Sequence, residues 1–118
     1  MAANNEALMT IQAAINKLDR LSAGSWPGEF GFDNDNSDGS SLECFVTGEY
    51  GIAFSTGYVG NGDSRAHSEL AAAGMNSAPV IREFLVVAVH YIKSGIRFGL
   101  IETLALDLSR AILVGSES

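Results

Sequence analysis

The stretch from Ala78 to Phe98 reads APVIREFLVVAVHYIKSGIRF and is the most apolar run in the chain. Its polar residues recur at intervals of eight, three and four, which places them on one stripe of an α-helix. The pattern predicts a central helix with Ser77 as N-cap and Pro79 in its first turn. The polar stripe comprises Arg82, His90, Lys93 and Arg97, and the apolar face comprises Ile81, Phe84, Leu85, Ala88, Val89, Ile92 and Ile96.

Shorter patterned segments flank this helix on both sides. Apolar residues spaced by three and four predict an N-terminal helix over 4–22 and a C-terminal helix over 100–114. Alternating residues and turn signals predict three strands. A short helix that Gly74 ends should follow them. The expected strands span 29–33, 42–47 and 50–56, and the short helix spans 64–73.

These elements together predict one α+β domain over residues 1–118. A small antiparallel β-sheet of three to four strands packs against the central helix, and the N- and C-terminal helices cover the remaining apolar faces. On the strand over 42–47, Leu42, Cys44 and Val46 share one face while Phe45 competes for the core from the other. Which face points inward is left open.

Negative charge is concentrated in the middle of the chain. The net charge is −7, and the segment from Leu21 to Ser64 holds acidic residues but no Lys or Arg. Such a segment repels phosphate backbones, so we expect no direct binding of nucleic acid. It is either a solvated surface or a surface for a basic protein partner, with Glu43 and Glu49 as candidate contact residues.

Few residues are available for catalysis or for metal binding. The single cysteine, Cys44, permits no internal disulfide and is expected to be a small core residue. The N-terminus lacks the pattern of a signal peptide, and the apolar run from Phe84 to Ile92 is too short to span a bilayer. We therefore expect a cytoplasmic protein without membrane contact or cofactor.

The polar loop from Asp33 to Gly39 contains the residues that most resemble metal ligands. Asn34, Asn36, Asp38 and Gly39 match the first half of an EF-hand loop, but Phe45 stands where the loop needs a bidentate carboxylate. We expect a solvated loop, and whether it holds a metal is left open.

A second candidate site is a small-molecule site around the glycine-rich turn before Ser64. A helix N-terminus attracts anions, and aromatic rings stack on bases, which favours a nucleotide-like ligand. The candidate residues are Trp26, Tyr58, Arg65 and His67. An alternative is a small hydrolase that uses His67 with Ser64, Ser68 or Asp63, although no nucleophile signature is present.

Two segments resemble small accessory proteins of tailed phages of the Ead type. They are Leu21 to Trp26, LSAGSW, and Glu69 to Ile81, ELAAAGMNSAPVI. The resemblance implies a phage or prophage origin and an action on host machinery in the host cytoplasm. It implies no chemistry.

The function that we expect is therefore non-enzymatic. The chain would inhibit or sequester a host component, which is a host protein or a nucleotide-like small molecule, as a counter-defence inhibitor does. A third alternative is a structural subunit of a larger assembly. The segment Leu100–Val114 is apolar on more than one side, which indicates either a homodimer contact or a core large enough to cover both sides.

Overall fold

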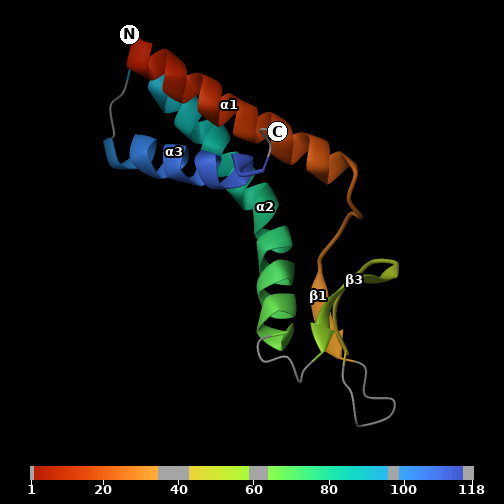
Figure 1. Ribbon diagram of the computed structural model, residues 1–118. Coiled ribbons are helices and arrows are strands. Elements are labelled where there is room, and N and C mark those ends of the chain that lie inside the picture. Colours follow the sequence, from red (N-terminus) through yellow and green to blue (C-terminus); the bar gives the residue numbers. More distant parts are fainter. Residues whose placement is uncertain (1, 35–42, 59–63, 96–98, 116–118) are drawn as a thin grey trace. The chain divides into compact units, whose positions relative to one another are not determined.

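The computed structural model describes residues 2–34, 43–58, 64–95 and 99–115 (Figure 1). The chain forms α1 (Ala2–Ala23), β1 (Gly31–Asn34), β2 (Glu43–Gly48), β3 (Gly51–Tyr58), α2 (Ser64–Lys93) and α3 (Gly99–Leu113). The predicted α+β fold with an antiparallel sheet and terminal helices is confirmed. The elements fall into two compact units, residues 1–24 with 79–118 and residues 25–78, so α2 contributes to both. The expectation of one domain over residues 1–118 stays a prediction.

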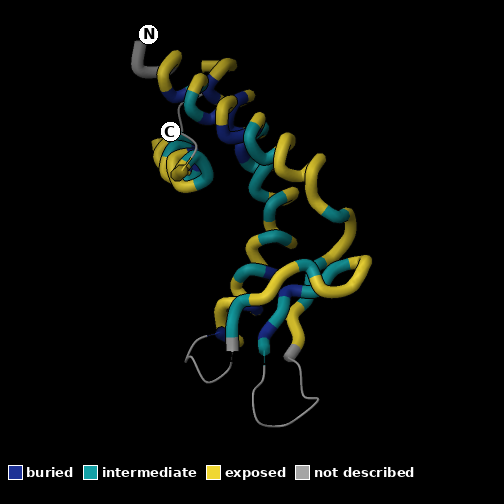
Figure 2. Tube along the Cα trace, turned by 45° about the vertical axis from the view of Figure 1, so that its right-hand side comes forward, coloured by how far each residue is buried: buried dark blue, intermediate teal, exposed yellow. Residues whose placement is uncertain are grey.

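The first unit is built from α1, the second half of α2, and α3, which runs beside α1 (Figure 1). The predicted apolar faces of α1 and α2 form its core, and Figure 2 shows the buried positions along these helices. Arg97 and Ile96 lie outside the described residues. The buried core comprises Ile11, Ala14, Ile15, Leu85, Ala88, Val89, Ile92 and Ala105.

Spacing by three and four predicts an apolar face on α3 that leaves out Leu106 and Leu113, and most of this face is confirmed because Ile101, Ala105, Leu108 and Ile112 lie in or against the core. Leu104, which belongs to the predicted face, is half exposed, whereas Leu106 and Leu113 pack against the core. The C-terminal end of α3 is held by Lys17, whose Nζ donates to the main-chain oxygen of Ile112 at 2.6 Å. This cation satisfies a carbonyl that the helix itself leaves unpaired.

The second unit is a three-stranded antiparallel sheet in the order β1-β2-β3, together with the first half of α2. In the register Val46 lies opposite Phe32 on one side and Phe54 on the other. Cys44 and Val46 are fully buried, whereas Phe45 is only half buried. The inward face of β2 is therefore the one that carries Cys44 and Val46. The prediction that Cys44 is a core residue is confirmed.

Small residues on α2 allow the helix to approach the sheet closely. Thr56 of β3 donates to the main-chain oxygen of Ser64 at 2.9 Å, and its hydroxyl also bonds the Ser68 hydroxyl. Ser64, Ser68 and Ala72 are buried at a spacing of four, so they lie along one side of the helix. Ser64 and Ser68 therefore face β3.

The prediction of two helices separated at Gly74 is wrong, because α2 continues from Ser64 to Lys93. Ser77 is therefore no N-cap, and Pro79 lies inside the helix rather than in a first turn. Glycine ends a helix when it takes a left-handed conformation, and Gly74 is not among the residues with positive φ. Proline removes one hydrogen bond and crowds the preceding turn, a local cost that the packing on both sides of Pro79 exceeds.

Candidate functional site

The β2–β3 turn carries an aromatic cluster. The rings of Trp26 and Tyr50 meet edge to face, with centroids 5.3 Å apart and planes at 88°. A Cβ atom on Gly48 would lie 2.8 Å from the Trp26 ring, so only glycine leaves room for the indole here. Trp26 is half buried, whereas Tyr50 and its neighbour Glu49 are exposed. We call Trp26, Glu49 and Tyr50 the turn patch.

The other three predicted ligand residues belong to the opposite end of β3, away from the β2–β3 turn. Tyr58 is the last residue of β3, and its side chain lies outside the described part of the structure. Arg65 and His67 are exposed in the first two turns of α2, which the Thr56–Ser64 hydrogen bond places near the same end of β3. β3 has eight residues from Gly51 to Tyr58, so its two ends lie about 23 Å apart. Arg65 and His67 lie two positions apart on α2, so their side chains point to different sides of the helix, and Trp26 lies at the other end of β3.

The two predicted protein-binding carboxylates are also separated. Glu43 begins β2 opposite Tyr58 and is half buried. Glu49 follows the other end of β2, where it stands exposed beside Tyr50. Only Glu49 therefore belongs to the turn patch.

The serines proposed for hydrolase chemistry have structural partners. Ser64 and Ser68 are buried, and the Ser68 hydroxyl donates to the main-chain oxygen of Ser64 at 3.2 Å. His67 points to solvent on the same helix. Asp63 and most of the Asp33–Gly39 loop lie outside the described residues, and within the described ranges no three His, Cys, Asp or Glu side chains are grouped to hold a metal.

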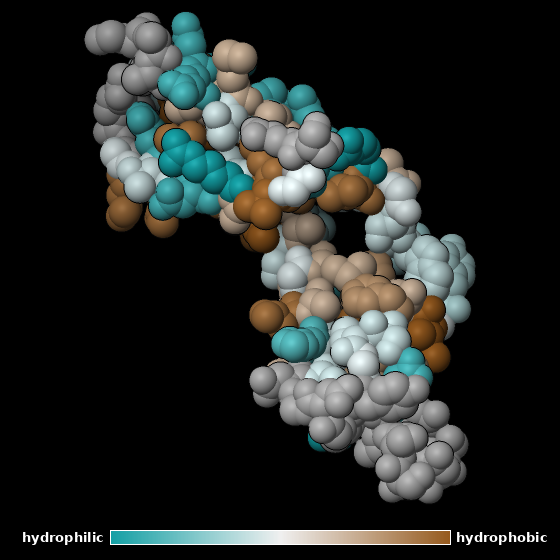
Figure 3. All heavy atoms as spheres, in the orientation of Figure 1, coloured by the Kyte–Doolittle hydropathy of each residue, from teal (hydrophilic) through white to brown (hydrophobic). Residues whose placement is uncertain are grey.

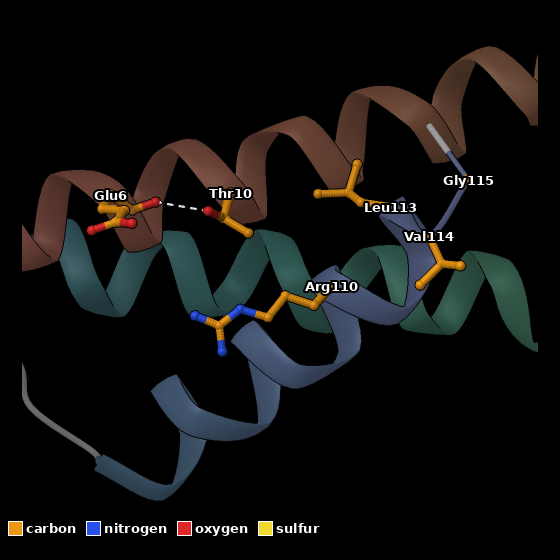
Figure 4. Close-up of a pocket in the computed structure, with 6 residues that line it drawn as sticks. All are labelled: Glu6, Thr10, Arg110, Leu113, Val114 and Gly115. Atoms are coloured by element: carbon orange, nitrogen blue, oxygen red, sulfur yellow. Dashed lines mark hydrogen bonds between the residues drawn. The ribbon is translucent and has the colours of Figure 1, made fainter. Parts of the chain in front are cut away.

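Open grooves mark the surface of the first unit, among them three of about 480, 340 and 260 Å³. The groove of about 480 Å³ is lined by Glu6, Thr10, Arg110, Leu113, Val114 and Gly115 (Figure 4). Thr10 donates to the main-chain oxygen of Glu6 at 3.0 Å, and Arg110 extends along the groove from α3. Glu6 and Arg110 are exposed and Thr10 is half buried, which is typical of a solvated helix junction.

The groove of about 260 Å³ collects the predicted polar stripe of α2. Arg82 donates from Nε to Asp19 of α1 at 2.6 Å, and this hydrogen bond, aided by the charge of Asp19, raises the pKa of Arg82. Arg82 of this polar stripe therefore links α2 to α1, so the stripe does not face only solvent. The lining residues are Gln12, Ile15, Asp19, Arg82, Val86, Val89, His90 and Lys93.

Hydrophobic side chains reach the surface of both units (Figure 3). By length and composition α2 would also be able to cross a membrane, and 22% of its most apolar window is buried. The expectation of no membrane contact remains a prediction.

Sequence reasoning identified aromatic residues such as Trp26 and Tyr50 as candidates for one pocket, but it missed the contacts that assemble the turn patch. Trp26 and Tyr50 are 24 positions apart, and no periodic pattern links them. The available signal was Gly48, since a glycine in a strand often marks a close approach by another group.

Comparison of the chain with protein-family models, curated proteins and solved structures finds no match. The resemblance to phage proteins of the Ead type therefore remains a prediction.

Proposed function

We propose that this chain is a non-enzymatic binding protein that docks on a basic protein surface through the turn patch. In the phage context that the resemblance implies, the partner is a host component, which the chain inhibits or sequesters in the host cytoplasm.

The observation behind this proposal is that Tyr50 is exposed and also held by a ring contact. The residue is 68% exposed, yet its ring meets the ring of Trp26 edge to face. An aromatic residue that is already ordered loses little conformational entropy on binding, and Tyr and Trp are the residues that most often dominate binding energy at interfaces.

Charge favours a basic partner. Glu49 stands next to Tyr50, Glu29 is exposed three residues after Trp26, and the whole chain carries a net charge of −7. Negative charge around an apolar centre steers a basic surface into place and repels acidic ones.

The test is affinity capture from a lysate of the host with the immobilised chain, followed by measurement of affinity for the captured protein. We expect Tyr50→Ala to weaken binding about tenfold or more, and Glu49→Lys to weaken it more strongly at low salt than at high salt. Glu43→Lys is the matched control, because Glu43 lies at the other end of β2.

Equal loss of affinity in Glu43→Lys and Glu49→Lys would contradict the turn patch as the site. Full affinity in Tyr50→Ala would contradict it as well.

A further inference from the structure

One face of α2 within the first unit is apolar and exposed. Val80, Val87 and Tyr91 are 71%, 44% and 37% exposed, and Phe84 is half buried. Their spacing of four, three and four is that of a coiled-coil seam, in which such residues form a narrow stripe. Phe84 lies at the edge of this stripe and also packs against the core, whose buried residues on the same helix are Leu85, Ala88, Val89 and Ile92.

Charged and polar residues border this stripe on one side only. Glu83 and His90, each one position before a stripe residue, are exposed there. On the other side lie Ile81, which is half buried, and Ala88, which is fully buried. Glu83 and His90 are seven positions apart, as are Ile81 and Ala88, so both borders follow the same seven-residue repeat as the stripe.

We propose that a second copy of this chain covers the stripe, with its own α2 running antiparallel. In this register Phe84 packs on Val87 of the second copy and Val80 packs on Tyr91 of the second copy, so that each larger ring meets a smaller aliphatic side chain. The two-fold symmetry repeats both contacts, as a closed dimer requires.

Charge complementarity selects this register. The antiparallel pairing of the two α2 helices in this register sets Glu83 of each copy beside His90 of the other, where the imidazole N–H donates to the carboxylate. Shifting the register by seven residues toward the N-terminus sets Glu83 against Glu83 of the second copy, and like charges there repel. A parallel pairing instead sets Glu83 beside Ala88, which is buried in the core of its own copy.

The same border disfavours a lipid occupant. Arg82 and Glu83 lie in the middle of the apolar window of α2, and Arg82 is bonded to Asp19. Burying this helix in hydrocarbon would strip water from those charges, which is costly. A protein surface that offers His90 to Glu83 avoids that cost.

The test is the mass of the purified full chain in solution, measured by sedimentation velocity over a range of concentrations. We expect a dimer for the unchanged chain and a monomer for Val87→Glu. His90→Glu should raise the dimer dissociation constant about tenfold or more, and Glu83→Lys combined with His90→Glu should return it to within about threefold of the original. The matched control is Leu100→Glu, on an exposed leucine of α3, which should stay dimeric.

Helical circular dichroism and Trp26 fluorescence show whether each variant is folded. A monomer at every concentration would overturn the proposal, and so would a monomer that floats with phosphatidylglycerol vesicles, which would assign the stripe to a membrane. A dimer that Leu100→Glu dissociates and Val87→Glu does not would also overturn it, and would assign the interface to α3.

Discussion

Asn76 of α2 and Phe30, just before β1, share two hydrogen bonds. The Phe30 N–H donates to Asn76 Oδ1 at 2.7 Å, and Asn76 Nδ2 donates to the Phe30 carbonyl at 2.8 Å. The side-chain amide thus reproduces the pairing that a neighbouring strand would supply. Asparagine is a poor helix former, and these two bonds explain why α2 carries one in its interior.

Replacing Asn76 therefore tests how the sheet is attached to α2 within the second unit. We expect Asn76→Ala to lower the free energy of unfolding by about 1–2 kcal/mol, because it leaves both main-chain groups of Phe30 without this partner. Urea denaturation measures the change. Ser77→Ala, on the next residue, is the control and should be neutral, since the Ser77 hydroxyl bonds only within its own helix turn. Equal effects of the two variants would show that the amide pairing adds nothing.

Two glycines should respond to alanine in opposite directions. Gly48→Ala places a Cβ 2.8 Å from the Trp26 ring and should destabilise the fold by about 1–3 kcal/mol while shifting the fluorescence of the single tryptophan. Gly74→Ala meets open space inside α2 and should stabilise the fold by about 0.5–1 kcal/mol. Thermal unfolding of both variants gives the comparison. A destabilised Gly74→Ala variant would mean that the helix is broken there after all.

Lys17 should stabilise the C-terminal end of α3. Its Nζ bonds the carbonyls of Ile112 at 2.6 Å and Val114 at 3.4 Å. Lys17→Met should cost about 0.5–1.5 kcal/mol and speed amide hydrogen exchange in the last turn of α3. Arg20→Met, an exposed position on α1, should stay within about 0.5 kcal/mol of the original chain. Unchanged exchange in Lys17→Met would count against this capping role.

The Arg82–Asp19 ion pair should contribute little stability despite its short distance of 2.6 Å. Both side chains are more than one third exposed, so water and salt screen the pair. A double-mutant cycle with Asp19→Asn and Arg82→Gln should give only a small coupling that shrinks further in 1 M salt. A coupling that salt does not change would indicate a buried pair instead.

The pH dependence of this pair follows from the raised pKa of Arg82. A raised folded-state pKa stabilises the fold below the unfolded-state value, and the contribution disappears only as pH rises through the folded-state value. For an arginine both lie in strongly alkaline solution. The stabilising contribution of the Arg82 charge should therefore be fully present at both pH 7 and pH 9. The difference in unfolding free energy between the original chain and Arg82→Gln, measured by urea titration, should be the same at these two pH values.

The helical core was predictable because one stripe of each helix is apolar over several turns. Ile11 and Ile15 of α1, and Leu85 and Ile92 of α2, occupy the core as their spacing indicated. The continuity of α2 was not predictable, because Gly74 and Pro79 are helix breakers by intrinsic preference, and tertiary packing overrides such preferences. The same applies to Leu104 and Leu106, since periodicity alone does not say on which sides α3 meets its neighbours.

The candidate site was predictable only in its parts. Trp26 was recognised as a candidate from its aromatic character and Glu49 from its charge, and the turn that carries Glu49 and Tyr50 is local, since Gly48 lies opposite Gly51. The contact between Trp26 and Tyr50 joins positions that are 24 apart, and one sequence does not reveal such a long-range contact.

The most direct test of the account is amide hydrogen exchange of the chain alone and in complex with the protein that it captures. The account predicts that protection on binding is strongest in the peptide that contains Glu49 and Tyr50 and is also present around Trp26. Protection confined to other segments, with the β2–β3 turn exchanging as fast in the complex as in the free chain, would contradict the proposed binding surface.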